Sequence, residues 1–154
     1  MARDIEMNRR AFVAALGMAA LGARAQRFQP PQDITPLIEG ITRGAVPEAR
    51  DVEVELPQIA ENGNSIPLHV RVASPMTADD HVVAIHVFAE RNPRPRVATF
   101  HLGPYSGRAE VNARIRLAGT QKVTVLAELS GGRFRIRPVE VLVTLAACLD
   151  EASL

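Results

Sequence analysis

The chain has one cysteine, no tryptophan and only four histidines among its 154 residues. With a single cysteine, Cys148, no disulfide can form within the chain, so this thiol is free, paired between chains or carrying an attached group. The four histidines, His69, His81, His86 and His101, lack the close pairing expected of a metal site. The sequence therefore predicts neither a metal centre nor a bound cofactor.

Lysine is nearly absent, occurring only at Lys122, so arginine supplies almost all of the positive charge. This composition favours planar contacts with carboxylates or oxyanions over diffuse charge. Residues 1–25 carry four basic and two acidic side chains, so their removal would change the formal net charge from +1 to −1. A chain so close to neutrality is not expected to bind nucleic acid or an anionic membrane by bulk attraction.

The chain also lacks an apolar run long enough to span a bilayer, since Ala14–Leu21 is too short. Two adjacent arginines, Arg9 and Arg10, precede this run, and the small residues of Ala23-Arg24-Ala25 follow it. We interpret residues 1–25 as a twin-arginine (Tat) signal, removed after export of the folded protein to the periplasm. An amphipathic N-terminal helix is disfavoured because no polar positions alternate with the apolar ones. Residues 26–145 are then one small domain, and residues 146–154 a C-terminal arm.

Helical patterning is confined to one short segment, Pro36–Ile41, which we expect Thr35 to cap and Gly44 to follow. Its apolar face should dock on a sheet edge or on a partner. Beyond it, period-two patterns separated by turn residues predict seven or eight short strands without intervening helices. The expected runs are Val52–Leu56, Ile66–Val72, Val82–Ala89, Val97–Leu102, Val111–Leu117, Val123–Leu129, Phe134–Ile136 and Val139–Leu145. The predicted fold is all-β, an immunoglobulin-like β-sandwich with a short N-terminal helix.

Few residues outside the arm are candidates for catalysis. His86 and His101 flank a proline-rich hairpin and could approach each other across strands, but we favour two half-exposed strand histidines. The segment Asp79-Asp80-His81 resembles a fragment of an acid/base site; adjacent strand residues point to opposite faces, so a capping or turn role is preferred. Gly131-Gly132 is too short to hold a phosphate and predicts a hairpin turn. No base or oxyanion site accompanies Cys148, which argues against an enzyme that acts alone.

Several blocks in order resemble one family, SoxY, the sulfur-carrying subunit of the periplasmic Sox sulfur-oxidation system. The resemblance extends from the signal to about Leu145. Its blocks are Leu56–Gly63, Ser74–Met76, Asp80–Pro93, Val97–His101 and Arg114–Gln121.

This resemblance implies a carrier protein that is not itself an enzyme. Proteins similar to this one have an immunoglobulin-like fold, pair with a smaller β-sandwich subunit, SoxZ, that has no signal of its own, and are exported through the Tat pathway as a complex. No membrane association is implied once the signal is removed. In the family, a cysteine in a terminal Gly-Gly-Cys-Gly-Gly arm is joined oxidatively to a sulfur species by the haem protein SoxAX. SoxB then hydrolyses the terminal sulfonate, and a sulfane dehydrogenase oxidises the remainder. Cys148 occupies the carrier position here.

The arm departs from the family pattern around that cysteine. Ala146, Ala147, Leu149 and Asp150 stand where four glycines are expected, and Glu151–Leu154 extend the chain further. Alanine lacks the conformational freedom of glycine, so the arm should be stiffer. The side chain of Leu149 adds bulk, and the acidic residues disfavour a thiolate and repel anionic substrates. Two hypotheses remain: Cys148 carries sulfur on an altered arm, or the chain is a divergent SoxY-like structural or regulatory subunit whose cysteine carries none.

Overall fold

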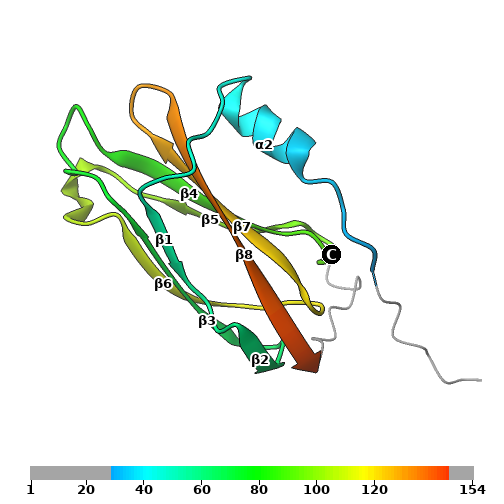
Figure 1. Cartoon of the computed structure of the whole chain (residues 1–154). Helices are drawn as coiled ribbons and strands as arrows, with labels where there is room; N and C mark the ends of the chain where they lie inside the picture. The colour runs from blue at the N-terminus through cyan, green and yellow to red at the C-terminus, as the bar shows by residue number, and fades with distance from the viewer. Residues whose placement is uncertain (1–28, 146–154) are drawn as a thin grey trace, which may run out of the picture.

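Alternating apolar and polar residues build two β-sheets that pack face to face, with one short helix on the outer face of the larger sheet (Figure 1). This computed structural model describes residues 29–145. The elements in chain order are α2 Thr35–Thr42, β1 Val52–Glu55, β2 Ile59–Asn62, β3 Ile66–Val72, β4 Val82–Ala89, β5 Arg96–His101, the 3-10 turn η1 Pro104–Ser106, β6 Glu110–Ile115, β7 Gln121–Leu129 and β8 Arg133–Leu145.

The smaller sheet has the order β1-β3-β6, and the larger has the order β2-β8-β7-β4-β5. All pairs are antiparallel except β2 and β8, which run parallel. Along β3 burial alternates residue by residue, which is the pattern of a strand with one face in the core. The inward residues of both sheets form one apolar core that includes Val70, Ile85, Val87 and Val125, all fully buried. The predicted all-β sandwich is confirmed.

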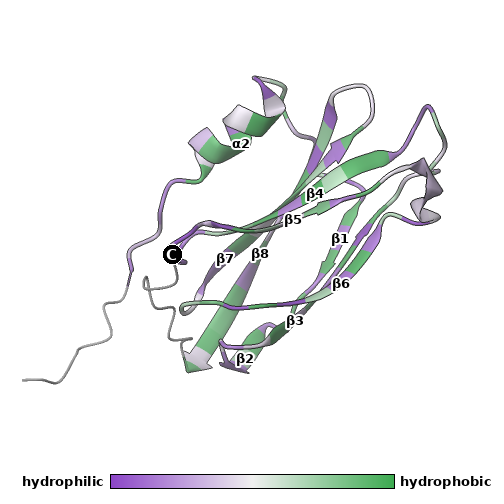
Figure 2. Ribbon diagram, turned by 180° about the vertical axis from the view of Figure 1, so that it is seen from behind, coloured by the Kyte–Doolittle hydropathy of each residue, from purple (hydrophilic) through white to green (hydrophobic). Residues whose placement is uncertain are grey.

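Helix α2 covers part of the outer face of the larger sheet, and this gives the central strands a second buried face. Phe88 on β4, Leu126 on β7 and Phe134 on β8 pack beneath Ile34 and the apolar side of the helix. For this reason β4 is buried along nearly its whole length and is apolar throughout most of it (Figure 2). The helix therefore docks on the face of a sheet, where the sequence had suggested an edge or a partner.

The start of α2 differs from the prediction that Thr35 is its cap. Ile34 is the N-cap, with its carbonyl accepting from Leu37 and Ile38 at 3.1 Å. Asp33 instead supplies the side-chain acceptor: its Oδ1 receives the Thr35 N–H at 2.9 Å, and this bonding lowers the pKa of Asp33. The helix begins one residue earlier because burying the Ile34 side chain fixes the chain there. At the other end Gly44 follows the helix, as expected, with φ of 88°.

Two strands differ from the expected runs by more than one or two residues at their ends. No separate strand was predicted at β2, which pairs with β8 through Ile59, Ala60 and Asn62. Two expected runs are instead one strand, since β8 continues from Arg133 to Leu145 through Pro138. The residues on either side explain this continuity: Ile136 and Leu142 donate their N–H groups to Glu48 and Gln58, away from β7. Because backbone direction repeats every two residues, position 138 also faces away from β7. Proline, which has no N–H, therefore breaks no hydrogen bond between β8 and β7 there.

Candidate functional site

The most informative region for function is the end of β8, because it is the base from which the predicted carrier arm leaves the domain. Leu145 is the last described residue, and Cys148 follows three residues later, outside the described residues. Up to Leu145 the strand is paired within the larger sheet, with β7 as far as Val141 and with β2 from Leu142 to Leu145. The end of β8 is therefore the attachment point of the arm, and its geometry is known. We call it the base of the arm.

Hydrogen bonds from both sides hold this base in place. On the β2 side, Gly63 donates its N–H to the Leu145 carbonyl at 2.7 Å, and the Thr144 hydroxyl donates to the Glu61 carbonyl at 2.9 Å. On the other side, the Val143 N–H donates to Thr120 Oγ1 at 2.9 Å. The Thr120 side chain thus continues the β7–β8 ladder beyond its last backbone pair, Gln121 with Val141. Hydrogen bonds therefore hold the strand up to its last residue, Leu145.

A buried amide network supports the loop that carries Thr120. Asn92 Oδ1 accepts from the Ala118 N–H and from Gln121 Nε2, both at 3.0 Å, while Asn92 Nδ2 donates to the Arg116 carbonyl at 2.9 Å. Gln121 Oε1 in turn accepts from the Arg91 N–H at 2.7 Å. Both amide residues are about 95% buried, and buried amides stay in place only when their bonds are satisfied. The network ties the loop after β4 to the loop before β7.

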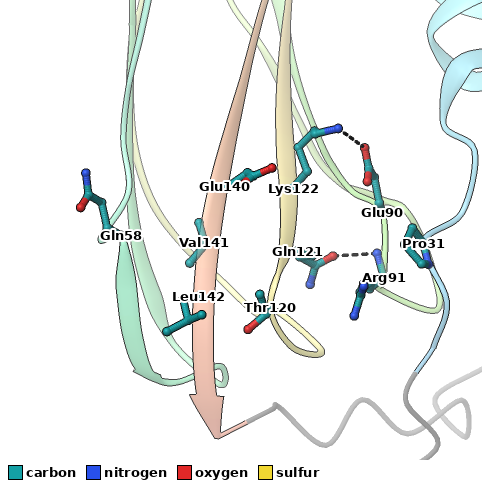
Figure 3. A pocket seen from close by; sticks show the side chains of 10 residues that line it. All are labelled: Pro31, Gln58, Glu90, Arg91, Thr120, Gln121, Lys122, Glu140, Val141 and Leu142. Carbon is teal, nitrogen blue, oxygen red and sulfur yellow. Dashed lines mark hydrogen bonds and ion pairs between the residues drawn. The ribbon is translucent and has the colours of Figure 1, made fainter.

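A groove of about 560 Å³ lies beside this base and is open to solvent along β7 and β8 (Figure 3). Its charged side chains are Lys122, which lies 3.7 Å from Glu90, together with Arg91 and Glu140. Two positive and two negative groups cancel, so the groove has no net preference for an anion. The full lining is Pro31, Gln58, Glu90, Arg91, Thr120, Gln121, Lys122, Glu140, Val141 and Leu142.

The histidines do not form a common site. His69 lies on the smaller sheet, with Nε2 2.8 Å from Glu110 Oε1 and Nδ1 3.2 Å from Glu55 Oε2. These bonds, the one to Glu110 foremost, raise the pKa of His69. Within residues 29–145 no group of three or more His, Cys, Asp or Glu side chains is arranged to hold a metal ion.

His86 differs from the expectation of a half-exposed strand histidine, because it is buried at 6% exposure. Its register partner on β5 is Thr99, whose hydroxyl lies 3.1 Å from Nδ1, while the exposed His101 is opposite Ala84. Nε2 has no hydrogen-bond partner among the described residues and lies 3.6 Å from Glu128 Oε2. Burial lowers the pKa of His86 against the opposing effect of Glu128. The ring is therefore a neutral part of the outer core near Phe88.

The other two sequence candidates have structural roles. Asp80 closes a turn, accepting the Thr77 N–H on its carbonyl at 2.9 Å, and its carboxylate pairs with Arg133 at 2.7 Å. His81 Nδ1 lies 3.0 Å from the Thr77 carbonyl in the same turn. Gly131 and Gly132 join β7 to β8 with φ of 79° and 72°, which is the left-handed region that a tight hairpin needs. The preferred turn interpretations are confirmed.

Comparison with known proteins identifies the family of this chain. The family model for the sulfur oxidation protein SoxY matches residues 39–148. The chain belongs to the SoxY family. A solved structure of the sulfur carrier protein SoxY from Chlorobium limicola f thiosulfatophilum is 30% identical with a TM-score of 0.58, covering 73% of this chain and 100% of that one. SoxY membership supports a sulfur-carrier role in sulfur oxidation.

More distant structures share the fold alone. A superoxide reductase (neelaredoxin) from Ignicoccus hospitalis is 14% identical with a TM-score of 0.55, covering 61% of this chain and 80% of that one. The superoxide reductase from Nanoarchaeum equitans is 10% identical with a TM-score of 0.53, covering 62% and 100%. No curated protein sequence matches this chain significantly. Among the described residues, no helix has the length and apolar character needed to cross a membrane.

Sequence reasoning missed the residues that build the base of the arm. Asn92 and Gln121 both lie in the blocks that resemble SoxY, yet neither was assigned a role because they are 29 positions apart, one in the loop after β4 and the other at the start of β7. The available signal was their polarity next to runs of buried apolar residues. An amide flanking a core strand is either at the surface or part of a buried network, and only the structure distinguishes the two.

Proposed function

We propose that this SoxY-family chain is a periplasmic sulfur-carrier subunit that holds sulfur-oxidation intermediates covalently on Cys148 and presents them to Sox enzymes. The observation that carries the proposal is the extent of the family match, which runs to residue 148 and so ends on the one cysteine of the chain. The firmly bonded end of β8, three residues earlier, supports it, because a carrier needs a thiol beyond a fixed base.

The chemistry requires only a reactive sulfur from this chain. When thiosulfate is loaded, an S–S bond forms between Cys148 Sγ and the outer sulfur, the thiol proton is lost, and two electrons pass to a SoxAX-like haem protein. A SoxB-like hydrolase then uses one water to break the bond between the outer sulfur and the sulfonate, which releases sulfate and a proton and leaves a persulfide on Cys148. A sulfane dehydrogenase would oxidise that remaining sulfur.

The geometry of the base sets how partners must approach. From Leu145 to Cys148 an extended chain spans only about 10 Å, so each enzyme must contact the domain close to the end of β8. Attachment through a short arm keeps the intermediate at high effective concentration near the partner's pocket. We further propose that a SoxZ-like subunit pairs with this chain as a heterodimer and that the complex is exported by the Tat pathway.

The test is the mass of the intact protein recovered from sulfur-fed cells under non-reducing conditions. We expect adducts of one or more sulfur atoms or of a thiosulfonate group, removed by a thiol reductant and absent from Cys148→Ser. The same variant should change the free energy of unfolding by less than about 0.5 kcal/mol, because Cys148 lies outside the last alternating run of apolar residues in the sequence. A protein that is never modified would refute the carrier role.

The composition of the arm favours a second candidate, a structural or regulatory SoxY-like subunit. Replacing Ala146, Ala147, Leu149 and Asp150 by glycine and deleting Glu151–Leu154 restores a flexible arm with two fewer acidic groups. We expect this glycine arm to be loaded faster than the native arm by an ordinary SoxAX enzyme. If only the glycine arm is loaded, the native chain is the structural or regulatory subunit. Equal loading of both arms would show that the substitutions do not matter.

A further inference from the structure

Three exposed arginines lie at the end of the sandwich that carries the base of the arm. Arg94 is in the hairpin between β4 and β5, Arg114 is on β6, and Arg116 directly follows β6. Figure 1 shows this hairpin, the loop between β6 and β7 and the end of β8 at the same end of the molecule. We call these three side chains the arginine surface.

Hydrogen bonds connect the backbone of the arginine surface to the base of the arm. The Leu145 carbonyl accepts from the Gly63 N–H at 2.7 Å, and the Gly63 carbonyl accepts from the Leu117 N–H at 2.9 Å. The carbonyl of the preceding residue, Arg116, accepts from Asn92 Nδ2 at 2.9 Å, which ties the hairpin after β4 to the same loop. The arginines therefore belong to the framework that also holds the starting point of the arm.

The charge of the arginine surface is not neutralised within the domain. None of its three guanidinium groups forms an ion pair within residues 29–145, whereas Arg133 and Arg135, at the opposite end, each pair with an aspartate. Residues 91–96 and 114–120 together contain five arginines and no acidic residue. The adjacent strand β2 contributes one exposed carboxylate, Glu61. This end of the molecule is therefore basic, although the whole chain is close to neutral.

Two of the three arginines are also held in position before any partner binds. Arg94 stands between Pro93 and Pro95, and a residue before proline has a restricted backbone. The Arg114 guanidinium donates to Ser65 Oγ at 2.6 Å and to the Ser65 carbonyl at 3.0 Å. A guanidinium group has five N–H donors, so three remain for a partner. Groups that are already held lose less conformational freedom on binding.

We infer that the arginine surface docks a carboxylate-rich patch on the enzyme that loads Cys148. The inference rests on the proposed carrier function, in which an arm of about 10 Å brings the enzyme against this end of the domain. Charge complementarity identifies the occupant, because guanidinium groups without a partner attract carboxylates, steer the encounter and fix its orientation. The three side chains come from both sheets, and none of them lines the groove beside the base. They therefore suit an extended protein surface better than one small anion.

The test measures how a SoxAX-like haem enzyme loads the mature chain in complex with a SoxZ-like subunit. Thiosulfate is kept saturating, and the carrier complex is the varied substrate. We expect Arg94→Gln and Arg116→Gln each to raise the KM for the carrier roughly 2- to 5-fold, the effect of one exposed charge pair. The kcat should stay unchanged, because a docking contact is made equally before and during sulfur transfer. In the double variant, kcat/KM should depend less on salt than in the wild type.

Matched variants separate docking from other causes. Arg108→Gln makes the same charge change at an exposed arginine near the opposite end of β6, and it should leave the KM unchanged. Arg94→Lys should keep most of the affinity, whereas Arg94→Glu should raise the KM more than Arg94→Gln does. Arg114 is not substituted, because its bonds to Ser65 also hold the loop before β3. Thermal unfolding confirms that the domain is intact in each variant.

Three results would overturn the inference. An equal effect of Arg108→Gln would mean that only net charge matters. A raised KM for thiosulfate, with the KM for the carrier unchanged, would mean that the arginines hold the small anion. Normal loading with weakened binding of the SoxZ-like subunit would assign the surface to that subunit.

Direct binding separates this inference from the carrier role. The Cys148→Ser chain cannot be loaded, so its affinity for the same haem enzyme reports docking alone. If the wild-type chain is never loaded but this affinity falls with Arg94→Gln, the docking surface stands and the carrier role fails. If the wild-type chain is loaded and neither affinity nor KM responds to Arg94→Gln and Arg116→Gln, the carrier role stands and the docking surface fails. If there is neither loading nor binding, both fail.

Discussion

Two histidines on this domain respond to folding in opposite ways. His69 is held between Glu110 and Glu55, which raises its pKa, whereas burial lowers the pKa of His86. A raised pKa means that folding favours the protonated ring, and a lowered pKa means that folding favours the neutral ring. The two effects fall on opposite sides of the ordinary pKa of 6.5, and single substitutions assign each of them to its residue.

Replacing His86 should remove a loss of stability at acidic pH. Below the ordinary pKa of 6.5, the unfolded chain binds a proton that the folded chain refuses, so the unfolding free energy falls with pH toward the lowered pKa. The slope is at most about 1.4 kcal/mol per pH unit. His86→Phe keeps a ring near Phe88, and its unfolding free energy relative to wild type should improve as pH falls from 7 to 5. Denaturant titrations measure this, and a wild-type-like slope would contradict it.

His69 should show the reverse dependence. Above the ordinary pKa of 6.5, the folded chain retains a proton that the unfolded chain has lost. The stabilisation is therefore complete below pH 6.5 and disappears as pH rises through the raised pKa. NMR titration of the ring should give a pKa above the ordinary value, and Glu110→Gln should lower it. Glu53→Gln, which removes a partner of Arg71 on the same sheet, should leave it in place.

Strand β8 is the element that links the apolar core to the arm. Its first half packs under α2 through Phe134, its middle passes Pro138, and its end pairs with β2. The direction of the N–H groups decides what this strand tolerates. The backbone N–H groups of Ile136 and Leu142 point away from β7. By the two-residue period of a strand, backbone groups at even-numbered residues between them face the same way, and those at odd-numbered residues face β7.

A proline shifted by one residue should therefore have a large effect. Val139→Pro removes an N–H directed toward β7 and should cost about 1–3 kcal/mol of unfolding free energy, because the facing carbonyl loses its donor. Pro138→Val adds an N–H at an open position and should change stability by less than about 1 kcal/mol. Denaturant unfolding of both variants measures the difference. Similar losses in the two would mean that the N–H directions assigned to β8 are wrong.

The strands that sequence predicted well are those whose burial alternates or whose apolar run is unbroken. β4 was predicted with its observed bounds because eight consecutive residues suit a strand buried on both faces. β2 was missed because Ile59-Ala60-Glu61-Asn62 has only one buried residue and depends on pairing with residues 142–145. The burial of His86 was missed for a related reason. Its ring lies on the outer face of the sheet between residues of neighbouring strands, Thr99 on β5 and Glu128 on β7, and the sequence of β4 alone does not show that these residues lie beside it. Cys148 was named from sequence, and the base that holds its arm required the structure.

At the scale of the whole molecule, the topology of the fold affects how the protein can be exported. The parallel pairing of β2 with β8 joins residues more than 80 positions apart, and the two sheets close over one core. Such non-local contacts form only when nearly the whole domain has been made. The export in the folded state that we propose, through the Tat pathway, suits a domain of this kind.

The last prediction follows from that route. Replacing Arg9 and Arg10 together by lysine retains the charge but removes the planar guanidinium pair. We expect this variant to fold, bind its SoxZ-like partner and remain in the cytoplasm with residues 1–25 attached. If the partner is exported only in complex with this chain, as we propose, it should be lost from the periplasm with it. Immunoblots of both subunits in separated fractions, with the N-terminal mass of this chain, measure the outcome; Arg3→Lys, outside the arginine pair, is the control. If the partner reaches the periplasm when this chain does not, the two are not exported as a complex, and if both do, the signal is not of the twin-arginine type.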